Sequence, residues 1–484
     1  MVKAKFSDIA KNRNLIFSPN FFKWNLELEA NSWFLSERIA DNFTILSGYA
    51  FKSSDYVDEG VAILRIGNIK KDGSIDFDGM NKLPNDFKEQ HKNYLILKND
   101  IVIAMTGATI GKSGLVSNLP YPTLLNQRVG IIRKKENAKV TVKFIQYLLR
   151  SLFFQKQVYI NSMGKSQPNI SPFDILNLKL PKIDNKTQSE LIKKIVPIEK
   201  EVNTLQEQKK EPLEIINEVF SDYYGYSKKL WKEFGKGMTA GTQKSNTKTF
   251  KTYSVSFSKI KNSKTLRFSS RFHNPITQKL TDILFSKPVI KVEKILSEIV
   301  KGIQPKYSNN GDVTVIKIAN LKNGYIDFED TELVKQSFYE NLTNKQKVHK
   351  NDILLCCTGK VSLGKIDIYE IYDDAVLSVD SYIIRVDDNK YNRLFFVYFF
   401  RSILGSYQIE RDYTGATNQI HLYDKQIKDF DIPNIPLKEQ EKLVSEITKK
   451  LNAQKEIDKK IEEKQNKISE LIENTIKEND KANA

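Results

Sequence analysis

The stretch NKTQSELIKKIVPIEKEVNTLQEQKKEPLEIINEVF occupies residues 185–220 and separates two longer segments of mixed character. Its apolar residues recur at alternating steps of four and three positions, which is the spacing of a helix that meets a partner helix along one seam. The seam residues are Leu191, Ile195, Ile198, Val202 and Leu205, and Ile216 and Val219 continue the same phase. The pattern predicts a long coiled-coil helix, with kinks or breaks at Pro197 and Pro212 because proline removes a backbone donor.

A second stretch of the same kind closes the chain after Pro436. Its apolar residues in the same phase are Leu443, Ile447, Ile457, Ile461, Ile468 and Leu471. All of them except Ile461 follow an apolar seam residue of the first stretch by 252 positions, whereas Ile461 falls opposite Lys209. A constant offset favours two helices that pack on each other. The alternative is two unrelated amphipathic helices, each covering its own domain.

The rest of the chain also contains an internal repeat, whose two copies are separated by nearly the same offset. VAILRIGNIKKDGSIDFDG at 61–79 parallels VTVIKIANLKNGYIDFED at 313–330, and KNDI occurs at 98–101 and at 350–353. Other matched pairs are Phe6 with Phe257, Phe17 with Phe268, Gly107 with Gly359, Arg150 with Arg401, Gly164 with Gly415, Pro181 with Pro433, and Gln188 with Gln440. A repeat sustained over this length indicates two copies of one structural unit.

Each copy alternates short apolar runs with Gly, Asn and Asp turns and ends in a helical pattern, which predicts an α/β (α+β) fold with internal pseudo-twofold duplication. The strands are expected at Val61–Ile66, Ile101–Met105 and Val129–Ile132, and again at Val313–Ile318, Ile353–Cys357 and Tyr382–Val386. Shorter helices are expected over Val142–Gln155 and Leu394–Leu404. The predicted divisions are a first domain with its leading segment at 1–184, a helix at 185–224, a flexible linker at 225–249, a second domain with its leading segment at 250–436, and a second helix at 437–484.

The 484 residues carry a formal net charge of +17, from 76 Lys and Arg against 59 Asp and Glu. Such an excess indicates a polyanionic partner, most often nucleic acid, and a lysine-rich proteome is the alternative explanation. No apolar run approaches the roughly 18 residues of a membrane-spanning helix, and the N-terminus lacks the apolar core of a signal peptide. We therefore expect a cytoplasmic protein with no membrane partner.

Catalytic motifs are sparse. The stretch MTGATIGKSG at 105–114 is one residue too short between its glycines for a phosphate-binding loop, and the second copy has Ile366 where a magnesium-binding hydroxyl is needed. A glycine-rich turn between strands is the better interpretation, with N–H groups and a lysine open to a DNA phosphate. The four histidines are scattered, and Cys356 and Cys357 are adjacent in an apolar run, so neither a metal site nor a disulfide is predicted.

These repeated units resemble the specificity subunit of type I restriction-modification systems. The resemblance is carried by GKSQPNISPFDILNLKLPKIDNKTQ at 164–188, by GATNQIHLYDKQIKDFDIPNIPLKEQ at 415–440 and by the TG-x-x-x-G-type turns. It covers nearly the whole chain, although Gln419 and Ile420 are adjacent where the pattern separates such residues. The resemblance implies two target recognition domains that each read half of a split, asymmetric site on double-stranded DNA.

The same resemblance implies two antiparallel helices that hold the domains apart and dock methyltransferase (M) subunits. A helix of roughly 35 residues spans about 50 Å, or about one and a half turns of DNA. No cofactor is expected in this chain, because S-adenosylmethionine, ATP and Mg would be held by the M subunits and the restriction (R) subunits. Two alternatives stay open: a stand-alone duplicated DNA-binding protein (a decoy or a regulator), and a methyltransferase or nuclease whose motifs are not recognisable.

Base reading requires side chains with paired donors and acceptors, so Lys, Arg, Asn and Gln residues in loops are the DNA-binding candidates. They are Lys52, Lys112, Gln127, Arg128, Lys165 and Gln167 in the first domain, and Lys306, Lys360, Lys365, Asn418 and Gln419 in the second. The alternative for each is a solvated surface residue or a turn-stabilising amide. The candidates for a subunit-interface helix are Leu191, Ile195, Val202, Leu205, Leu443, Ile447, Ile457 and Ile461. No catalytic or metal-binding residue is predicted.

Overall fold

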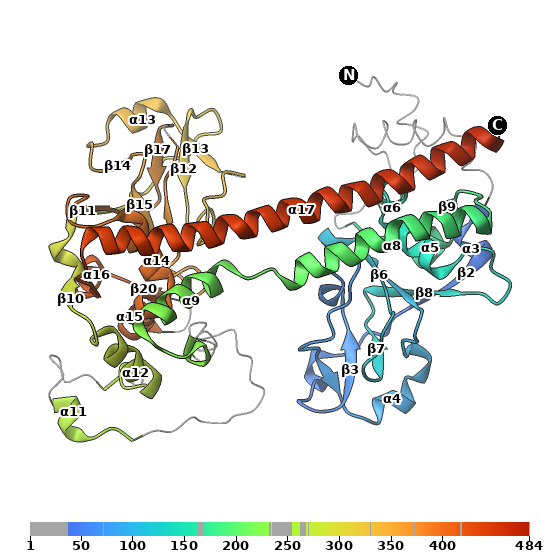
Figure 1. The fold of residues 1–484 in the computed structure, drawn as a ribbon, viewed down its shortest axis with the longest axis horizontal. Helices are drawn as coiled ribbons and strands as arrows, with labels where there is room; N and C mark the ends of the chain where they lie inside the picture. The colour runs from blue at the N-terminus through green and yellow to red at the C-terminus, as the bar shows by residue number, and fades with distance from the viewer. Residues whose placement is uncertain are drawn as a thin grey trace. The chain divides into compact units, whose positions relative to one another are not determined.

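The chain folds into two compact units, one within residues 1–208 and 458–484 and the other within residues 209–457 (Figure 1). The computed structural model describes residues 37–483 except 71, 163–167, 232, 233, 235–253, 262–267, 270, 330, 372, 417 and 418. The leading segment that contains Phe6 and Phe17, and most of the expected linker, lie outside the described residues. Each unit combines one copy of the repeat with part of the last helix, α17 (Leu437–Asn483).

The first unit contains short strands followed by helices. Its described strands are β1 (Glu37–Arg38), β2 (Phe43–Ser47), β3 (Val61–Leu64), β4 (Lys82–Leu83), β5 (Ile101–Ala104), β6 (Ser113–Leu115), β7 (Thr123–Leu125), β8 (Val129–Lys134) and β9 (Lys179–Leu180). Its described helices are α3 (Ile39–Asn42), α4 (Phe87–Gln90), α5 (Val142–Arg150), α6 (Leu152–Ser162), α7 (Pro172–Leu176) and α8 (Asn185–Glu207).

The second unit repeats this order of elements. Its described strands are β10 (Val289–Lys291), β11 (Leu296–Lys301), β12 (Val313–Ile316), β13 (Glu332–Val334), β14 (Lys347–Val348), β15 (Ile353–Cys356), β16 (Ile366–Ile368), β17 (Ala375–Leu377), β18 (Ser381–Val386), β19 (Thr414–Ala416), β20 (Gln419–His421) and β21 (Asp431–Pro433). Its described helices are α9 (Pro212–Tyr224), α11 (Phe257–Lys261), α12 (Pro275–Leu284), α13 (Gln336–Glu340), α14 (Arg393–Arg401), α15 (Ile403–Asp412) and α16 (Asp424–Asp429). The expected α/β class and the six expected strands are confirmed.

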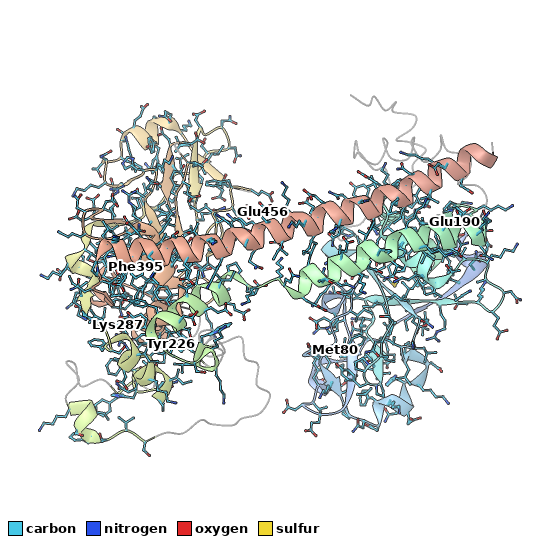
Figure 2. All side chains as sticks on the ribbon, in the orientation of Figure 1. Met80, Glu190, Tyr226, Lys287, Phe395 and Glu456 are labelled. Carbon is cyan, nitrogen blue, oxygen red and sulfur yellow. The ribbon has the colours of Figure 1, made fainter. Side chains whose placement is uncertain are left out.

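Each described unit is built mainly on two larger sheets and a layer of helices, accompanied by short two-stranded sheets. In the first unit the strands pair in the orders β2-β8-β5-β6 and β4-β3-β7. Successive side chains of a strand point to opposite faces. Ile101 and Ile103 therefore pack on the helices, whereas Val102 and Ala104 face the core shared with the second sheet, where Met80 also lies (Figure 2). Because β5 is buried on both faces, it reads as a continuous apolar run.

The second unit has the same arrangement in sheets β11-β18-β15-β16 and β13-β12-β17-β14. Ile353 and Leu355 pack with the helices, including Phe395 on α14, and Leu354 and Cys356 face the core between the sheets (Figure 2). Both cysteines are free and buried. Cys356 is the last residue of β15 and Cys357 directly follows it, so the strand expected at Ile353–Cys357 ends one residue earlier.

Buried polar contacts are duplicated with the fold. The Arg133 guanidinium donates to Asp100 at 2.7 Å, and the Arg385 guanidinium donates to Asp352 at 2.7 Å. Hydrogen bonding to the carboxylate raises the pKa of Arg133 and of Arg385. Each aspartate is almost completely buried, so each pair satisfies a charge that burial alone would make costly.

Only one of the two prolines coincides with a break in the helices, although the sequence predicted a kink or a break at both. Asp184 caps the first turn of α8, which continues through Pro197 and ends at Glu207. The break comes at Pro212, which opens α9 at the position where the missing N–H has no helical partner. The expected helices over Val142–Gln155 and Leu394–Leu404 are each split in two, because Ser151 and Ser402 adopt extended backbone between the paired helices.

The two stretches that carry the heptad pattern do pack on one another within each unit. In the first unit Leu191 and Ile195 of α8 share a core with Ile468, Ile472 and Ile476 of α17. Lys464 pairs with Glu201 and Asn479 donates to the Lys182 carbonyl, so the two helices run antiparallel. In the second unit Tyr223 of α9 donates to Glu439, and Lys210 donates its N–H to Gln454, again antiparallel.

Two glutamines join the long helices to the domains. Gln188 is 1% exposed; its side chain accepts the Thr141 N–H at 3.0 Å and donates to the Ile183 carbonyl at 2.9 Å. Gln440, also 1% exposed, accepts the Asn392 N–H at 2.8 Å and donates to the Ile435 carbonyl at 2.9 Å. Each amide therefore ties a helix start to the N-cap of α5 or α14, which explains why glutamine occurs at both positions.

We predict that Gln188→Ala lowers the free energy of unfolding of the first unit by about 2 kcal/mol, because two buried backbone groups lose their partners. Denaturant titration followed by circular dichroism measures the change. The exposed Gln90→Ala variant is the matched control and should stay within about 0.5 kcal/mol of the wild type. Equal stability of the two variants would contradict this role of Gln188.

Candidate nucleic-acid interface

Exposed polar side chains follow the parallel strands β3 and β7 at the edge where these strands end. The pair is in register at Leu64 and Leu125. Arg65 follows β3, and Gln127 and Arg128 follow β7 after one residue; all three are exposed. Ligands of open α/β sheets bind outside the carboxyl ends of the strands, so this edge is the natural place for a recognition surface.

Backbone hydrogen bonds bring further loops to the same edge. The Gln127 N–H donates to the Tyr49 carbonyl at 2.9 Å, and the Met105 N–H donates to the Arg128 carbonyl at 3.0 Å. The Ile170 N–H then donates to the Met105 carbonyl at 3.0 Å. We call the joined segments 49–52, 65–68, 105–107, 126–128 and 168–170 the strand-end loops of the first unit.

The strand-end loops contain three of the six candidates predicted for the first domain. Lys52, Gln127 and Arg128 are exposed on them. Lys165 and Gln167 lie outside the described residues, directly before the loop at 168–170. The structure thus brings together residues far apart in sequence whose donors suit base edges and phosphates.

The loop that carries Lys52 is held by packed rings. The Tyr49 ring lies 5.0 Å from the Phe51 ring and 4.4 Å from the His91 ring, centroid to centroid. Tyr49 nevertheless remains 42% exposed, and its ring can therefore be reached from solvent. His91 acts here as a packing residue, since its ring also lies 5.1 Å from the Phe51 ring.

The second unit builds the same loops. The Ile303 N–H donates to the Leu377 carbonyl at 2.9 Å, the Cys357 N–H to the Asp380 carbonyl at 2.9 Å, and the Leu422 N–H to the Cys357 carbonyl at 2.8 Å. Its strand-end loops are residues 303–307, 317–320, 357–360, 378–380 and 419–422. Lys306, Lys360 and Gln419 are exposed on them, and Asn418 lies outside the described residues.

The side chains on these matching backbones differ. Gln127 and Arg128 of the first unit occupy the positions of Val379 and Asp380 in the second. Asp380 accepts a hydrogen bond from the Thr358 hydroxyl at 3.0 Å. A guanidinium donates to guanine O6 and N7, whereas a carboxylate accepts from cytosine N4, so the two surfaces suit different bases.

Sequence reasoning missed Arg65 and Lys317. Both follow their strands directly, and the backbone N–H of each donates to the side-chain oxygen of the asparagine three residues later, Asn68 or Asn320, at 2.9 Å. Lys317 also pairs with Glu332 at 3.1 Å and lies 5.9 Å from the exposed Tyr307 ring. Both were assigned to strand interiors because the expected strands were drawn two residues too long; a basic residue at the end of an apolar run was the available signal.

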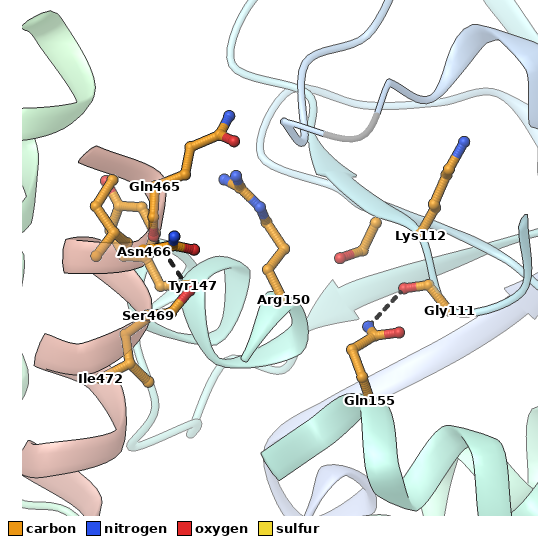
Figure 3. A pocket seen from close by; sticks show the side chains of 11 residues that line it. Gly111, Lys112, Tyr147, Arg150, Gln155, Gln465, Asn466, Ser469 and Ile472 are labelled. Carbon is orange, nitrogen blue, oxygen red and sulfur yellow. Dashed lines mark hydrogen bonds between the residues drawn. The ribbon is translucent and has the colours of Figure 1, made fainter. Parts of the chain in front are cut away.

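Lys112 and Lys365 do not belong to the strand-end loops. Lys112 lines a cavity of about 340 Å³ together with Arg150 of α5 and Gln155 of α6 (Figure 3). The Lys365 ammonium donates to the Ser362 hydroxyl at 3.3 Å and lines a cavity of about 290 Å³ with Arg401. Contact of these two lysines with DNA stays a prediction.

The glycine-rich turns have less freedom to bind a phosphate than expected. Gly107 and Gly359 have φ of 77° and 82°, which favours glycine and confirms a role in backbone geometry. However, the Gly107 N–H donates to the Pro168 carbonyl, and the Gly359 N–H donates to the Ile420 carbonyl. These two N–H groups are therefore not open to a DNA phosphate, and contact of the rest of each turn with DNA stays a prediction.

The residues predicted for a subunit interface are largely covered by the chain itself. Leu191, Ile195, Val202, Leu443 and Ile447 are buried, and Leu205, Ile457 and Ile461 are half-buried. By contrast, Val196 on α8 is 42% exposed and Leu213 on α9 is 40% exposed. The assignment of the buried set to a contact with another subunit stays a prediction.

Nothing in the described part of the chain assembles an obvious reactive centre. No group of three or more His, Cys, Asp or Glu side chains that could hold a metal ion is found among the described residues. Burial raises the pKa of Cys356 to about 12 and that of Cys357 to about 11. Among the described helices, none is both long and apolar enough to cross a membrane.

Comparison with known proteins gives matches in both halves of the chain. A protein-family model, the type I restriction modification DNA specificity domain, matches residues 36–215 and again residues 290–467. The type I restriction enzyme MjaVIII specificity subunit of Methanocaldococcus jannaschii is 35% identical over 141 residues, which are 28% of this chain and 32% of that protein. The type I restriction enzyme EcoAI specificity subunit of Escherichia coli is 32% identical over 165 residues, 33% of this chain and 27% of that protein. The matched segments thus span about a third of each relative.

Solved structures are similar at low identity. A type I restriction-modification system S subunit from M. genitalium covers 91% of this chain and 95% of its own, with 15% identity and a TM-score of 0.41. The HsdS subunit from Thermoanaerobacter tengcongensis covers 91% and 95%, with 13% identity and a TM-score of 0.30.

We predict that neither cysteine reacts with a thiol reagent at pH 8 in the folded protein. Since the thiolate is the reactive form, a pKa of about 11 or higher leaves at most about a thousandth of either thiol ionised at that pH. Mass spectrometry after iodoacetamide treatment should show two modifications only when denaturant is added. Rapid modification without denaturant would mean that strand β15 opens readily or that its thiols are not buried.

Proposed function

Because this chain belongs to the family of type I restriction modification DNA specificity domains, with one match in each half, we propose that it is the sequence-specific DNA-binding subunit of a type I restriction-modification complex. The matched family is a recognition domain and not a catalytic one. The proposed role is to select the DNA site at which other subunits act. The net charge of +17 favours a polyanion as the partner.

We propose that each unit reads one half of a bipartite, asymmetric site. The observation that carries this proposal is the pair of strand-end loops, which share backbone hydrogen bonds but carry Arg128 in one unit and Asp380 in the other. A shared scaffold with different donors and acceptors binds the same kind of ligand with different base preferences. Exposed tyrosines at Tyr49 and Tyr307 add rings that can contact sugars or bases.

We further propose that methyltransferase and restriction subunits dock on this chain in the cytoplasm. S-adenosylmethionine, ATP and Mg would then be bound by those subunits, which would methylate adenine or cleave DNA at the chosen site. Since the seam residues are turned into the units, the outer faces of α8 and α9, which carry Val196 and Leu213, are the better candidates for contact with them. This assigns the helices a double role, in the core and at the partner surface.

The second candidate function is a duplicated DNA-binding protein without a methyltransferase partner, acting as a decoy or a regulator. The same strand-end loops support this function, since they are evidence for DNA binding and carry no information about binding to other subunits. Copurification separates the two functions. If the chain is a subunit of a complex, a methyltransferase encoded beside it should copurify with it. If the chain is a decoy or a regulator, it should bind DNA alone.

Selection of bound duplexes from a random library tests DNA recognition directly. We predict that the chain, alone or with its methyltransferase partner, enriches two short sequences separated by a constant number of unselected base pairs. Enrichment of a single uninterrupted sequence, or of none, would contradict a bipartite site.

We predict that Arg128→Ala weakens binding to the selected duplex by about 10-fold and relaxes base preference in one half-site only, because a bidentate contact to guanine contributes about 1–3 kcal/mol. Fluorescence anisotropy with single-base variants of the duplex measures both effects. The control is Lys134→Ala, which removes an exposed charge at the other end of β8. If Arg128→Ala matched the control, or relaxed both half-sites equally, Arg128 would not read a base.

A further inference from the structure

Arg150 and Arg401 occupy matching positions at the ends of α5 and α14, but their surroundings differ. In the second unit Arg401 donates to the Ile366 carbonyl at 2.8 Å and pairs with Asp367. In the first unit Arg150 has no hydrogen-bond or ion-pair partner among the described residues. The matching arginine thus has an acidic partner in the second unit and none among the described residues of the first.

The strand register explains the difference. Asp367 of β16 lies opposite Leu354 of β15, and in the first unit Gly114 of β6 lies opposite Val102 of β5. Glycine therefore stands where the second unit has its carboxylate. The preceding position changes from Ile366 to Ser113, so the first unit loses an anion and gains a hydroxyl on the same strand.

The space around Arg150 is a polar cavity of about 340 Å³. Lys112, Ser113, Gln155, Gln465, Asn466 and Ser469 line it together with Arg150, and its lining contains no acidic residue. Figure 3 shows Arg150 rising between Gln465 on α17 and the turn at Gly111 and Lys112. The Ser113 side chain is 3% exposed, and its hydroxyl has no hydrogen-bond partner among the described residues.

Nearby carboxylates do not substitute for the missing partner. Glu199 and Asp72 act on Arg150 at longer range and line an adjoining cavity of about 410 Å³. Glu199 already accepts hydrogen bonds from Tyr147 and Lys143, and Asp72 accepts them from Ser74 and Gln206. The five donors of the Arg150 guanidinium therefore have no protein acceptor among the described residues.

We propose that the first unit binds a small phosphate-bearing anion, inorganic phosphate or a small phosphate monoester, in the cavity between Arg150, Ser113 and Lys112. Guanidinium groups pair with phosphate oxygens in a fork geometry, and a buried hydroxyl adds a further donor. A dianion balances the two cationic side chains of the lining, and the volume lies at the lower end of that of ligand sites. The matching arginine of the second unit, Arg401, is already paired with Asp367 and is not available to such a ligand.

Isothermal titration of the full chain with sodium phosphate, at ionic strength held constant with sodium chloride, tests this site without DNA. We expect one phosphate per chain, at least 10-fold weaker binding in Arg150→Gln, and a smaller loss in Ser113→Ala. Lys98→Gln, which removes an exposed charge from a turn outside the cavity, should bind as the wild type does. Circular dichroism of each variant identifies misfolding, and Ser113→Ala decides the question if Arg150→Gln does not fold.

A second titration with glycerol phosphate distinguishes the two sources of phosphate. Tighter binding than that of inorganic phosphate assigns the site to a monoester, and weaker binding assigns it to the free ion. No saturable binding by either ligand, or unchanged affinity in Arg150→Gln and Ser113→Ala, would overturn the proposal. Because DNA takes no part, failure here leaves the DNA-binding role intact.

Discussion

The antiparallel packing of α17 on α8 and α9 is the contact on which both units depend. Ile468, Ile472 and Ile476 complete the core of the first unit, and Leu443 and Ile447 complete that of the second. A single helix therefore supplies buried side chains to two cores, and the first unit completes its core only with residues from the far end of the chain. Burial of each such side chain contributes about 1.5–3 kcal/mol. Loss of helix pairing would expose both cores, so selection on either unit also maintains α17.

In both units the buried framework is the same, whereas the side chains of the strand-end loops differ. The ion pairs Asp100–Arg133 and Asp352–Arg385, and the amides of Gln188 and Gln440, recur because they satisfy buried groups of the scaffold. The strand-end loops satisfy their own backbone, so the side chains that follow β7 and β17 are free to differ. Arg128 and Asp380 are such a pair. Under the proposed function, base preference would change at these positions at little cost in stability, since backbone hydrogen bonds hold the loops in place.

The repeat made most of the fold predictable from sequence. A run such as Ile101–Ala104 is apolar on both faces, so a buried strand could be predicted there. The alternating spacing of four and three residues predicted the long helices. What escaped was set by local geometry: α8 passes through Pro197, and Ser151 and Ser402 split helices that looked continuous. Lys52, Gln127 and Arg128 were found because of their loop chemistry, and contact of any of them with DNA stays a prediction. Arg65 and Lys317 were not recognised as candidates because the predicted strands extended past them. That Arg150 lacks an acidic partner depends on which residues of β5 and β6 lie opposite each other, and no single stretch of sequence shows this pairing.

The claim that this chain selects a split DNA site is tested most directly by long-read methylation sequencing. Cells would express the neighbouring methyltransferase subunit with or without this chain. The account predicts a new adenine methylation motif, two short half-sites with a constant unread gap, that appears only when the chain is present. The same methylation in its absence, or none in its presence with a methyltransferase shown to be active, would contradict the account.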